Sequence, residues 1–240
     1  ASIGNYAFRS CASLTNVVLP DSVTSIGTYA FYACTGLTSV AIGNGVTNIG
    51  TYAFYQCNRL TSLTIGNSVA SIGNYAFRSC TSLTNVTMPD SLKIIGTYAF
   101  YGCISLNSAA IGDGVTNIGT YAFYQCTGLT NAVIGNSVTS IGTYGFYGCT
   151  GLTSVAIGNS LTNIGADAFS SCPNLIEISV SESNSVYSSI DSVLFNKNQT
   201  ILIQCPGGMV GSYTIPDSVT NVGVYAFYQC AGLTNVIIGN

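Results

Sequence analysis

The sequence contains no histidine and no tryptophan, and its charge is sparse, with five Lys and Arg against eight Asp and Glu. Without histidine the usual general base is missing, which removes Ser-His and Cys-His catalytic pairs. The small number of cationic residues argues against nucleic acid or an anionic membrane as partner. No stretch reaches about 18 consecutive apolar residues, so we expect no membrane insertion. We therefore expect a protein without catalytic residues and without a cofactor.

A 23-residue unit recurs along the chain and is clearest over residues 118–140, which read IGTYAFYQCTGLTNAVIGNSVTS. Steps of 23 residues align Ile-Gly pairs that begin at Ile3, Ile26, Ile49, Ile72, Ile95, Ile118, Ile141 and Ile164, and a ninth copy begins at Val222. A fixed period of this length is typical of solenoids. One unit alone cannot offset the entropy of ordering its residues, at about 1.5 kcal/mol each. The units must therefore stack as rungs, each covering the apolar edge of the next.

Within one unit the pattern predicts two short strands, a tight turn and a helical turn. Residues 37–42 alternate apolar and polar side chains and form the first strand. Residues 43–45 are turn formers, and residues 46–49 form a second short extended segment. Gly50 recurs as Gly in the other units, which indicates a positive φ or a close backbone approach. The apolar spacing in residues 52–57 predicts a short α or 3₁₀ segment.

The period breaks once, near the C-terminal end. The next Pro-Asp turn is delayed to Pro216, which leaves an elongated unit over roughly residues 176–216. Within it the apolar runs 192–195 and 201–204 flank five polar residues and predict a hairpin. This unit is either an elongated coil that packs like its neighbours or a ligand-specific insertion. Elsewhere the repeat is continuous, which predicts a single domain of about nine units over residues 1–240. Both ends fall within a unit, without a signal peptide or polar capping repeat, so we expect a segment of a longer protein.

The ten cysteines follow the repeat. Eight recur every 23 residues from Cys11 to Cys172, and Cys230 takes the same place in the ninth unit. Neighbouring rungs lie about 5 Å apart, within reach of a disulfide, but side chains in register point in parallel and a free thiol packs as a small apolar group. We predict a ladder of buried, reduced thiols, with cross-linked rungs as the alternative. Cys205, in the elongated unit, lacks a ladder partner. Without His or a Cys-x-x-Cys pair we expect no metal site.

Asp90 and Asp113 occupy the same turn position in adjacent rungs, which predicts a separation of about 5 Å. Such a pair could act as acid and base or hold Ca²⁺. Asp and Asn also favour tight turns for conformational reasons alone. The equivalent turns of other units carry Asn44, Asn67, Asn136 and Asn159. We therefore favour the turn interpretation, with a carboxylate-based enzyme as the alternative.

Two sets of outward positions are candidate ligand surfaces. On the sheet side the side chains are short and uncharged, and the candidate residues are Thr38, Ser39, Thr61, Ser62, Thr84, Asn85, Thr130 and Asn131. On the other side most of the 16 tyrosines recur at two positions, and the alternative surface is Tyr32, Tyr55, Tyr101, Tyr124 and Tyr147. Tyrosine suits contact with protein or glycan, although stacked rings can also simply cover one another. A threonine rank fits an ice-binding solenoid too, but Asn107 and Ile176 interrupt it.

Three recurring strings resemble those of a known repeat class: Leu-Thr-Ser-Val-x-Ile, Asn-Ser-Val-Thr-x-Ile-Gly and Tyr-Ala-Phe-x-x-Cys. They look like the BspA-like class of leucine-rich repeat, which is found in surface proteins of bacteria and some protists. The resemblance implies an α/β fold: a curved right-handed leucine-rich-repeat solenoid of 23-residue units, with parallel short strands on one side and short helical turns on the other. It also implies attachment to host or matrix proteins, and it carries over no catalytic residue.

We therefore expect a non-catalytic recognition or adhesion module, located outside the cell or at its surface. Its partner would be an extracellular protein or glycan, bound over a repeated surface and not in one pocket. A structural spacer in a large surface protein is the first alternative. An ice-binding protein or a carboxylate-based enzyme is the more distant one.

Overall fold

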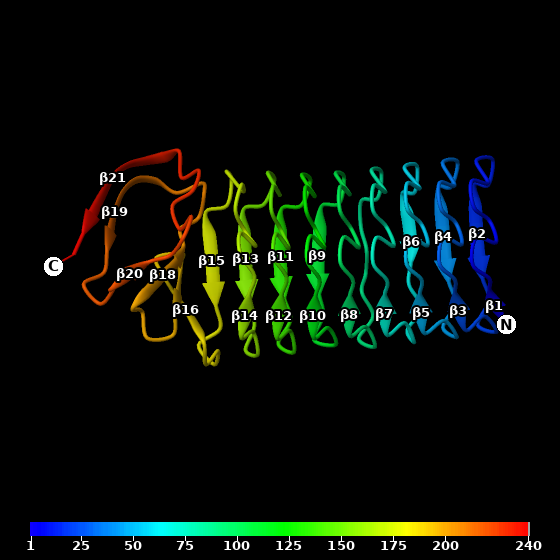
Figure 1. The fold of residues 1–240 in the computed structure, drawn as a ribbon, viewed down its shortest axis with the longest axis horizontal. Coiled ribbons are helices and arrows are strands. Elements are labelled where there is room, and N and C mark those ends of the chain that lie inside the picture. The colour runs from blue at the N-terminus through cyan, green and yellow to red at the C-terminus, as the bar shows by residue number, and fades with distance from the viewer. Residues whose placement is uncertain (240) are drawn as a thin grey trace.

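The computed structural model describes residues 1–239, which form a row of stacked turns along one long axis (Figure 1). The longest sheet follows the whole regular part of the stack, with eight parallel strands of two residues each. They are β1 (Ser2–Ile3), β3 (Ser25–Ile26), β5 (Asn48–Ile49), β7 (Ser71–Ile72), β8 (Ile94–Ile95), β10 (Asn117–Ile118), β12 (Ser140–Ile141) and β14 (Asn163–Ile164). Paired residues lie 23 positions apart, as Ile118 and Ile141 do. The repeat period is therefore the register of the sheet.

A longer strand lies on another side of most rungs. One parallel sheet contains β2 (Asn16–Leu19), β4 (Ser39–Ile42) and β6 (Ser62–Thr64); another contains β9 (Ser108–Ile111), β11 (Asn131–Ile134), β13 (Ser154–Ile157) and β15 (Glu177–Val180). In the rung between the two sheets, Asn85 forms an isolated bridge to Ser108. The strands predicted over residues 37–42 and 46–49 are confirmed as β4 and β5.

Columns of identical side chains fill the interior. The phenylalanine rings of successive rungs stack with centroids 5.0–5.6 Å apart, from Phe8 through to Phe169. Leucine, isoleucine, valine and cysteine side chains form similar columns that are almost fully buried. Burying one large apolar side chain stabilises the fold by about 1.5–3 kcal/mol. Because each ring packs on the rungs before and after it, the core is shared between units and belongs to none of them alone.

The expected helical turn over residues 52–57 is wrong. Across residues 1–239 the structure has no helix, and so none long and apolar enough to cross a membrane. Two residues of this segment are left-handed, Tyr52 with φ 56° and Gln56 with φ 58°. The amides also alternate in direction: Tyr55 donates to the carbonyl of Tyr52 at 3.2 Å, whereas Gln56 donates to Arg78 in the next rung at 2.9 Å. A helix needs successive i to i−4 bonds, so the described fold is an all-β solenoid and not an α/β one.

The repeated glycine at position 50 is explained by close backbone approach and not by its φ. A Cβ on Gly50 would lie 2.6 Å from the carbonyl carbon of Gly27 in the preceding rung, while the φ of Gly50 is not positive. The equivalent glycines from Gly27 to Gly165 are needed because the backbone of the preceding rung passes directly beside them. One of the two predicted reasons is confirmed.

After the parallel strand β15, the elongated unit continues with antiparallel strands. β16 (Tyr187–Ile190) pairs with β17 (Val193–Asn196), which pairs with β18 (Ile201–Gln204). The hairpin predicted over residues 192–204 is therefore confirmed, whereas β16 was not predicted. β18 then runs parallel to β20 (Asn221–Val222), and β19 (Val210–Ile215) runs parallel to β21 (Gly232–Ile238). The second half of the unit thus lies in the stack beside the final rung.

A buried asparagine fixes the start of the elongated unit. Asn184 is 1% exposed, and its side-chain amide donates to the carbonyls of Gly158 (2.9 Å) and Leu161 (3.1 Å). Its side-chain oxygen accepts the amides of Val186 (2.9 Å) and Tyr187 (2.8 Å). All the polar atoms of this buried side chain are therefore paired, and they tie the entry to β16 to the preceding rung.

Candidate functional site

The first candidate surface, the threonine face, lies at or just before the longer strands. The structure places its predicted residues, half-buried or exposed, in two neighbouring ranks: Thr38, Ser39, Thr61, Ser62, Thr84, Asn85, Thr130 and Asn131. The Thr38 hydroxyl donates to the carbonyl of Thr15 at 2.9 Å, and the Thr61 hydroxyl donates to Thr38 at 3.1 Å. Thr130 donates in the same way to Asn107 at 3.0 Å. These hydroxyl protons are committed to the preceding rung and are not available to a ligand.

Apolar side chains protrude beside and within the threonine ranks. Val18, Val133 and Ile176 are 67%, 53% and 59% exposed. They break up any flat, regular array of hydroxyl groups. This geometry counts against the ice-binding alternative.

The second candidate surface consists of two tyrosine columns. The first column contains Tyr6, Tyr29, Tyr52, Tyr75, Tyr98, Tyr121 and Tyr144, with adjacent ring centroids 4.5–5.0 Å apart. The second column contains Tyr32, Tyr55, Tyr101, Tyr124 and Tyr147, where adjacent tyrosine rings lie 4.9–5.2 Å apart. The columns meet obliquely, as in the 5.6 Å contact of Tyr52 with Tyr55 at 65°. Ring faces cover one another, which leaves ring edges and hydroxyl groups for a partner.

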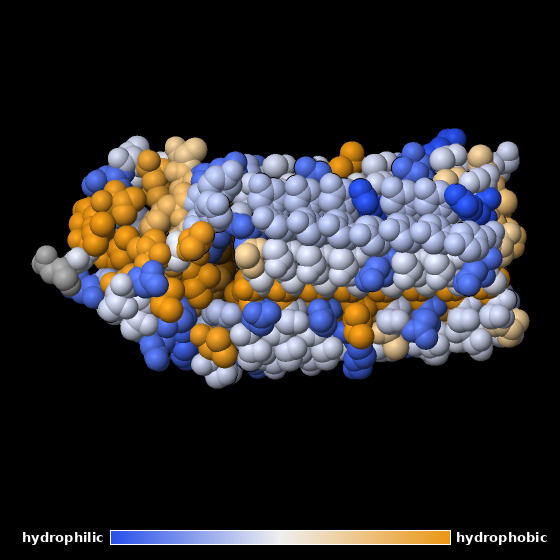
Figure 2. All heavy atoms as spheres, in the orientation of Figure 1, coloured by the Kyte–Doolittle hydropathy of each residue, from blue (hydrophilic) through white to orange (hydrophobic). Residues whose placement is uncertain are grey.

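Three tyrosines of the columns hold their phenol protons more tightly than a free tyrosine does. Burial, followed by the influence of neighbouring phenol groups, raises the pKa of Tyr52, Tyr98 and Tyr124. Phenols with a pKa above the ordinary value near 10 stay protonated and can donate hydrogen bonds. Figure 2 shows a face of the stack as pale, weakly polar rows with few strongly hydrophilic places, while hydrophobic surface gathers towards the C-terminal end.

Arginine takes the place of tyrosine at two positions of the second column, Arg9 and Arg78, and Arg78 has rings on both sides. Arg78 stands between Tyr55 and Tyr101, with its guanidinium carbon 5.6 Å and 4.5 Å from their ring centroids. The same carbon lies 5.7 Å and 5.8 Å from the rings of Tyr75 and Tyr98. Its Nε is buried and has no hydrogen-bond partner. The aromatic rings therefore surround this cation, as expected for cation–π contacts.

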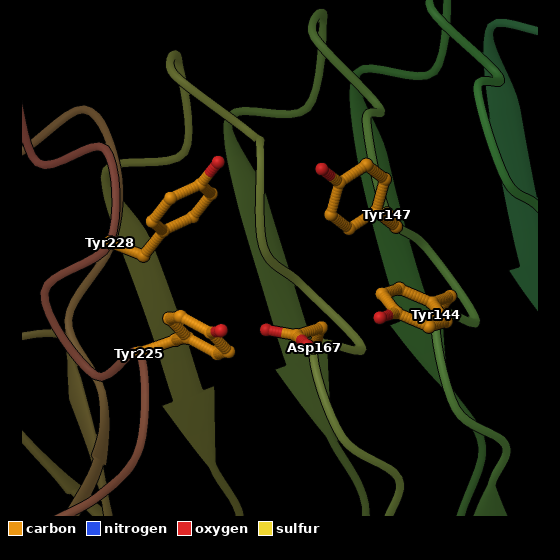
Figure 3. Close-up of a pocket in the computed structure, with 5 residues that line it drawn as sticks. All are labelled: Tyr144, Tyr147, Asp167, Tyr225 and Tyr228. Atoms are coloured by element: carbon orange, nitrogen blue, oxygen red, sulfur yellow. The ribbon is translucent and has the colours of Figure 1, made fainter.

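Both columns are interrupted at the rung of Asp167 and Ser170. These two residues stand where most rungs carry tyrosine. Asp167 lies between two pairs of rings that line a hollow of about 190 Å³ with it: Tyr144, Tyr147, Tyr225 and Tyr228 (Figure 3). Ser170 is buried, and its hydroxyl donates to the Asp167 carboxylate at 3.0 Å. The nearby Asp167 carboxylate is also the main cause that raises the pKa of Tyr144. We call this hollow the tyrosine–aspartate box.

The carboxylates of the predicted Asp90 and Asp113 pair belong to turns. Asp113 accepts the backbone amide of Asn136 in the next rung at 2.6 Å, and Asp21 accepts that of Asn44 at 2.6 Å. Turn Asp residues thus cap the following turn, which supports the turn interpretation. Within residues 1–239 no cluster of three or more His, Cys, Asp or Glu side chains is arranged to hold a metal ion.

The sequence reasoning found the tyrosine positions but missed their interruption. The signal was present, because a step of 23 residues leads from Tyr144 to Asp167 and from Tyr147 to Ser170. Sequence spacing could not show that Tyr225, which lies beyond the elongated unit, returns beside this rung. The box therefore depends on the path of the elongated unit as well as on the substitutions.

Comparison with protein families gives a match over residues 1–130 and 209–240 to the family described as "BspA type Leucine rich repeat region (6 copies)". This match covers more than half of the chain. Comparison with curated proteins gave no match.

Several solved structures are similar to this chain. A leucine-rich cell surface protein from Faecalibacterium prausnitzii A2-165 is 30% identical, with a TM-score of 0.67, over 100% of this chain and 65% of that protein. A leucine-rich repeat protein from T. pallidum is 28% identical, with a TM-score of 0.64, over 72% of this chain and 82% of that protein. The pneumococcal vaccine antigen PcpA is 18% identical, with a TM-score of 0.69, over 99% of this chain and 58% of that protein, and shows a shared fold.

Proposed function

We propose, from the premise that the chain belongs to the family of BspA-type leucine-rich repeat proteins, that it is a non-catalytic recognition module whose tyrosine columns bind a protein partner. The stacking of half-buried tyrosine rings over successive rungs is the observation that carries this proposal. The threonine face supports it less well, because its threonine hydroxyls already bond to neighbouring rungs.

Tyrosine contributes large contact area at low entropic cost, because its side chain has two rotatable bonds and the columns already hold the rings in place. A standard protein interface buries about 800 Å² on each partner, which at about 5 Å per rung extends over several rungs. Affinity should therefore come from many modest contacts along the columns. This distinguishes the proposed surface from a single catalytic or ligand pocket.

The names of the similar structures support a location outside the cell. The relative from Faecalibacterium prausnitzii is described as a cell surface protein, and this chain covers 65% of its length. A recognition module at a bacterial surface would meet extracellular proteins. We therefore include a cell-surface or secreted location and an adhesive role in the proposal.

The test is binding of the folded chain to immobilised matrix and host-surface proteins, followed by the triple change Tyr55→Ser, Tyr101→Ser and Tyr124→Ser. These second-column residues do not have positive φ, so serine introduces no backbone strain. Each lost ring in an interface should cost roughly 1 kcal/mol, so the triple variant should bind at least about 100-fold more weakly.

The matched control is Ser39→Ala, Ser62→Ala and Asn85→Ala on the threonine face, which should leave affinity within about twofold. Loss of binding in this control with full binding in the tyrosine variant would move the site to the threonine face. Binding to glycans and to none of the proteins would contradict the protein partner. Binding to nothing would favour the structural spacer, which the continuous eight-stranded sheet also supports.

A further inference from the structure

The tyrosine–aspartate box differs from the rest of the tyrosine surface because its rings lack a neighbour. Between successive rungs elsewhere in the columns, a ring face is covered by another ring or by a guanidinium group. At the box, Tyr147 and Tyr228 lie on either side of the hollow (Figure 3), and the rung after Tyr147 carries the small, buried Ser170 where a ring would stand. Ring faces carry negative electrostatic potential, so uncovered faces on two sides of a hollow favour a cation.

The chain itself shows which cation fits between its tyrosines. Position 170 lies four repeats beyond position 78, where Arg78 is held by rings on both sides. At position 78 the repeat supplies its own guanidinium group. At position 170 it supplies serine, so the place that corresponds to the Arg78 side chain is open.

The box also contains a counter-charge that the Arg78 site lacks. Asp167 replaces the first-column tyrosine of its rung, whereas Tyr75 is retained beside Arg78. The carboxylate is oriented by the Ser170 hydroxyl at 3.0 Å and lies in the hollow with the four rings. A planar guanidinium can stack on aromatic rings while its N–H groups bond to a carboxylate, which a compact ammonium does less well.

We propose that the tyrosine–aspartate box binds the guanidinium group of an arginine side chain carried by the protein partner. Tyr147 and Tyr228 flank the guanidinium plane, and Asp167 accepts its N–H groups. This inference rests on the proposed function for the partner, but the box itself can be tested without one. The box would then make one place on the repetitive tyrosine surface specific for an arginine side chain of the partner.

The first test is an NMR titration of the whole chain, labelled in its tyrosine rings, with N-acetyl-argininamide at constant ionic strength. We expect saturable shifts confined to Tyr144, Tyr147, Tyr225 and Tyr228. N-acetyl-citrullinamide has nearly the same shape without the charge, and N-acetyl-lysinamide has the charge without the plane. Both should bind at least about fivefold more weakly. Equal shifts with the citrulline compound, or no saturation with the arginine compound, would overturn the proposal.

The second test uses variants of the box. Asp167→Asn keeps the shape and suits the left-handed backbone at this position (φ 55°), and it should weaken binding of the arginine compound about tenfold. Asp113→Asn, which makes the same charge change in a distant turn, should have no effect. Ser170→Arg should fill the box with an internal guanidinium and abolish binding. Unchanged affinity in Asp167→Asn would overturn the proposed carboxylate contact.

The two proposals fail in distinguishable ways. If no protein partner is found but the arginine compound titrates the box, the proposed function fails and the arginine site stands. If a partner binds through Tyr55, Tyr101 and Tyr124 while Asp167→Asn and the citrulline compound show no difference, the arginine site fails and the recognition function stands.

Discussion

At the scale of single residues, the buried cysteines show how much a repeated position is constrained. The thiol of Cys80 donates to the carbonyl of Phe54 in the preceding rung at 3.2 Å, and the thiols of Cys103 and Cys126 make equivalent bonds. All ten cysteines are free, which confirms the predicted reduced ladder. Its first member, Cys11, is exposed, contrary to the predicted burial, because it lies in the first rung of the structure.

Cys205 was expected to lack a ladder partner, and the structure brings it close to Cys230 of the final rung. The Cys230 thiol lies 3.7 Å from the carbonyl oxygen of Cys205. A hydrogen bond between the two thiols raises the pKa of Cys205 and lowers that of Cys230. Sequence spacing could not show this pair. The path of the chain through the elongated unit decides which of its residues contacts the final rung, and this path does not follow the 23-residue period.

The buried thiols should make the fold sensitive to alkaline pH. Burial raises the pKa of Cys103 and Cys172 to about 12 from an ordinary 9.0. Below pH 9 both states keep the proton and the fold retains its full stability. Between pH 9 and 12 the unfolded chain loses the proton first, so stability falls by about 1.4 kcal/mol per thiol per pH unit.

Urea unfolding at pH 8 and pH 10 measures this loss. Cys103→Ala should reduce the drop between the two pH values by about 1.4 kcal/mol, whereas Cys11→Ala, at an exposed position, should leave it unchanged. An identical drop in both variants would contradict the assignment to buried thiols. Thiol titration of the native chain should detect Cys11 and Cys230 first and all ten cysteines in denaturant.

At the scale of elements, the segment that carries the tyrosines explains the largest error of the sequence reasoning. The apolar spacing of Ala53, Phe54 and Cys57 fits one helical turn, but it equally fits a ribbon of turns with two left-handed residues four positions apart. The second position with positive φ is occupied by Gln56 in one rung and by Gly102 or Gly148 in others. The glycines at this position could have indicated the positive φ from the sequence. Backbone hydrogen bonds to the next rung outweigh the conformational cost of the positive φ angles. The sequence of a single unit does not show these bonds. The strands, by contrast, follow from alternation alone.

The glycine column offers a test of close backbone approach. An added Cβ at Gly119 would lie 2.6 Å from both the carbonyl carbon of Gly96 and the amide nitrogen of Thr97. Since backbone atoms cannot move aside as a side chain can, Gly119→Ala should destabilise the chain by about 1–3 kcal/mol. At Gly112 the nearest atom would be the Asp90 carboxylate oxygen at 3.7 Å, so Gly112→Ala should be neutral or stabilise by up to about 1 kcal/mol. Equal effects in chemical denaturation would show that glycine is retained for another reason.

At the scale of the whole molecule, stability should be a sum of contacts between neighbouring rungs. Removal of residues 95–117 joins Ile94 to Ile118 in register and deletes one rung. The shortened chain should fold with unchanged strand content by circular dichroism, and its denaturant m-value should fall by about a tenth, in proportion to the surface lost. Removal of residues 95–105 leaves the register broken and should prevent cooperative folding. Failure of the in-register deletion to fold would point to one indivisible core.

The direction of the inter-rung bonds has a mechanical consequence. The strands lie across the long axis, so the hydrogen bonds that pair them lie along it (Figure 1). Tension between the two ends therefore pulls these bonds end-on, one rung at a time, and does not shear many at once. Each released rung of 23 residues would add at most about 80 Å of extended chain. Under load, such a segment would lengthen in steps and limit the force transmitted along the chain.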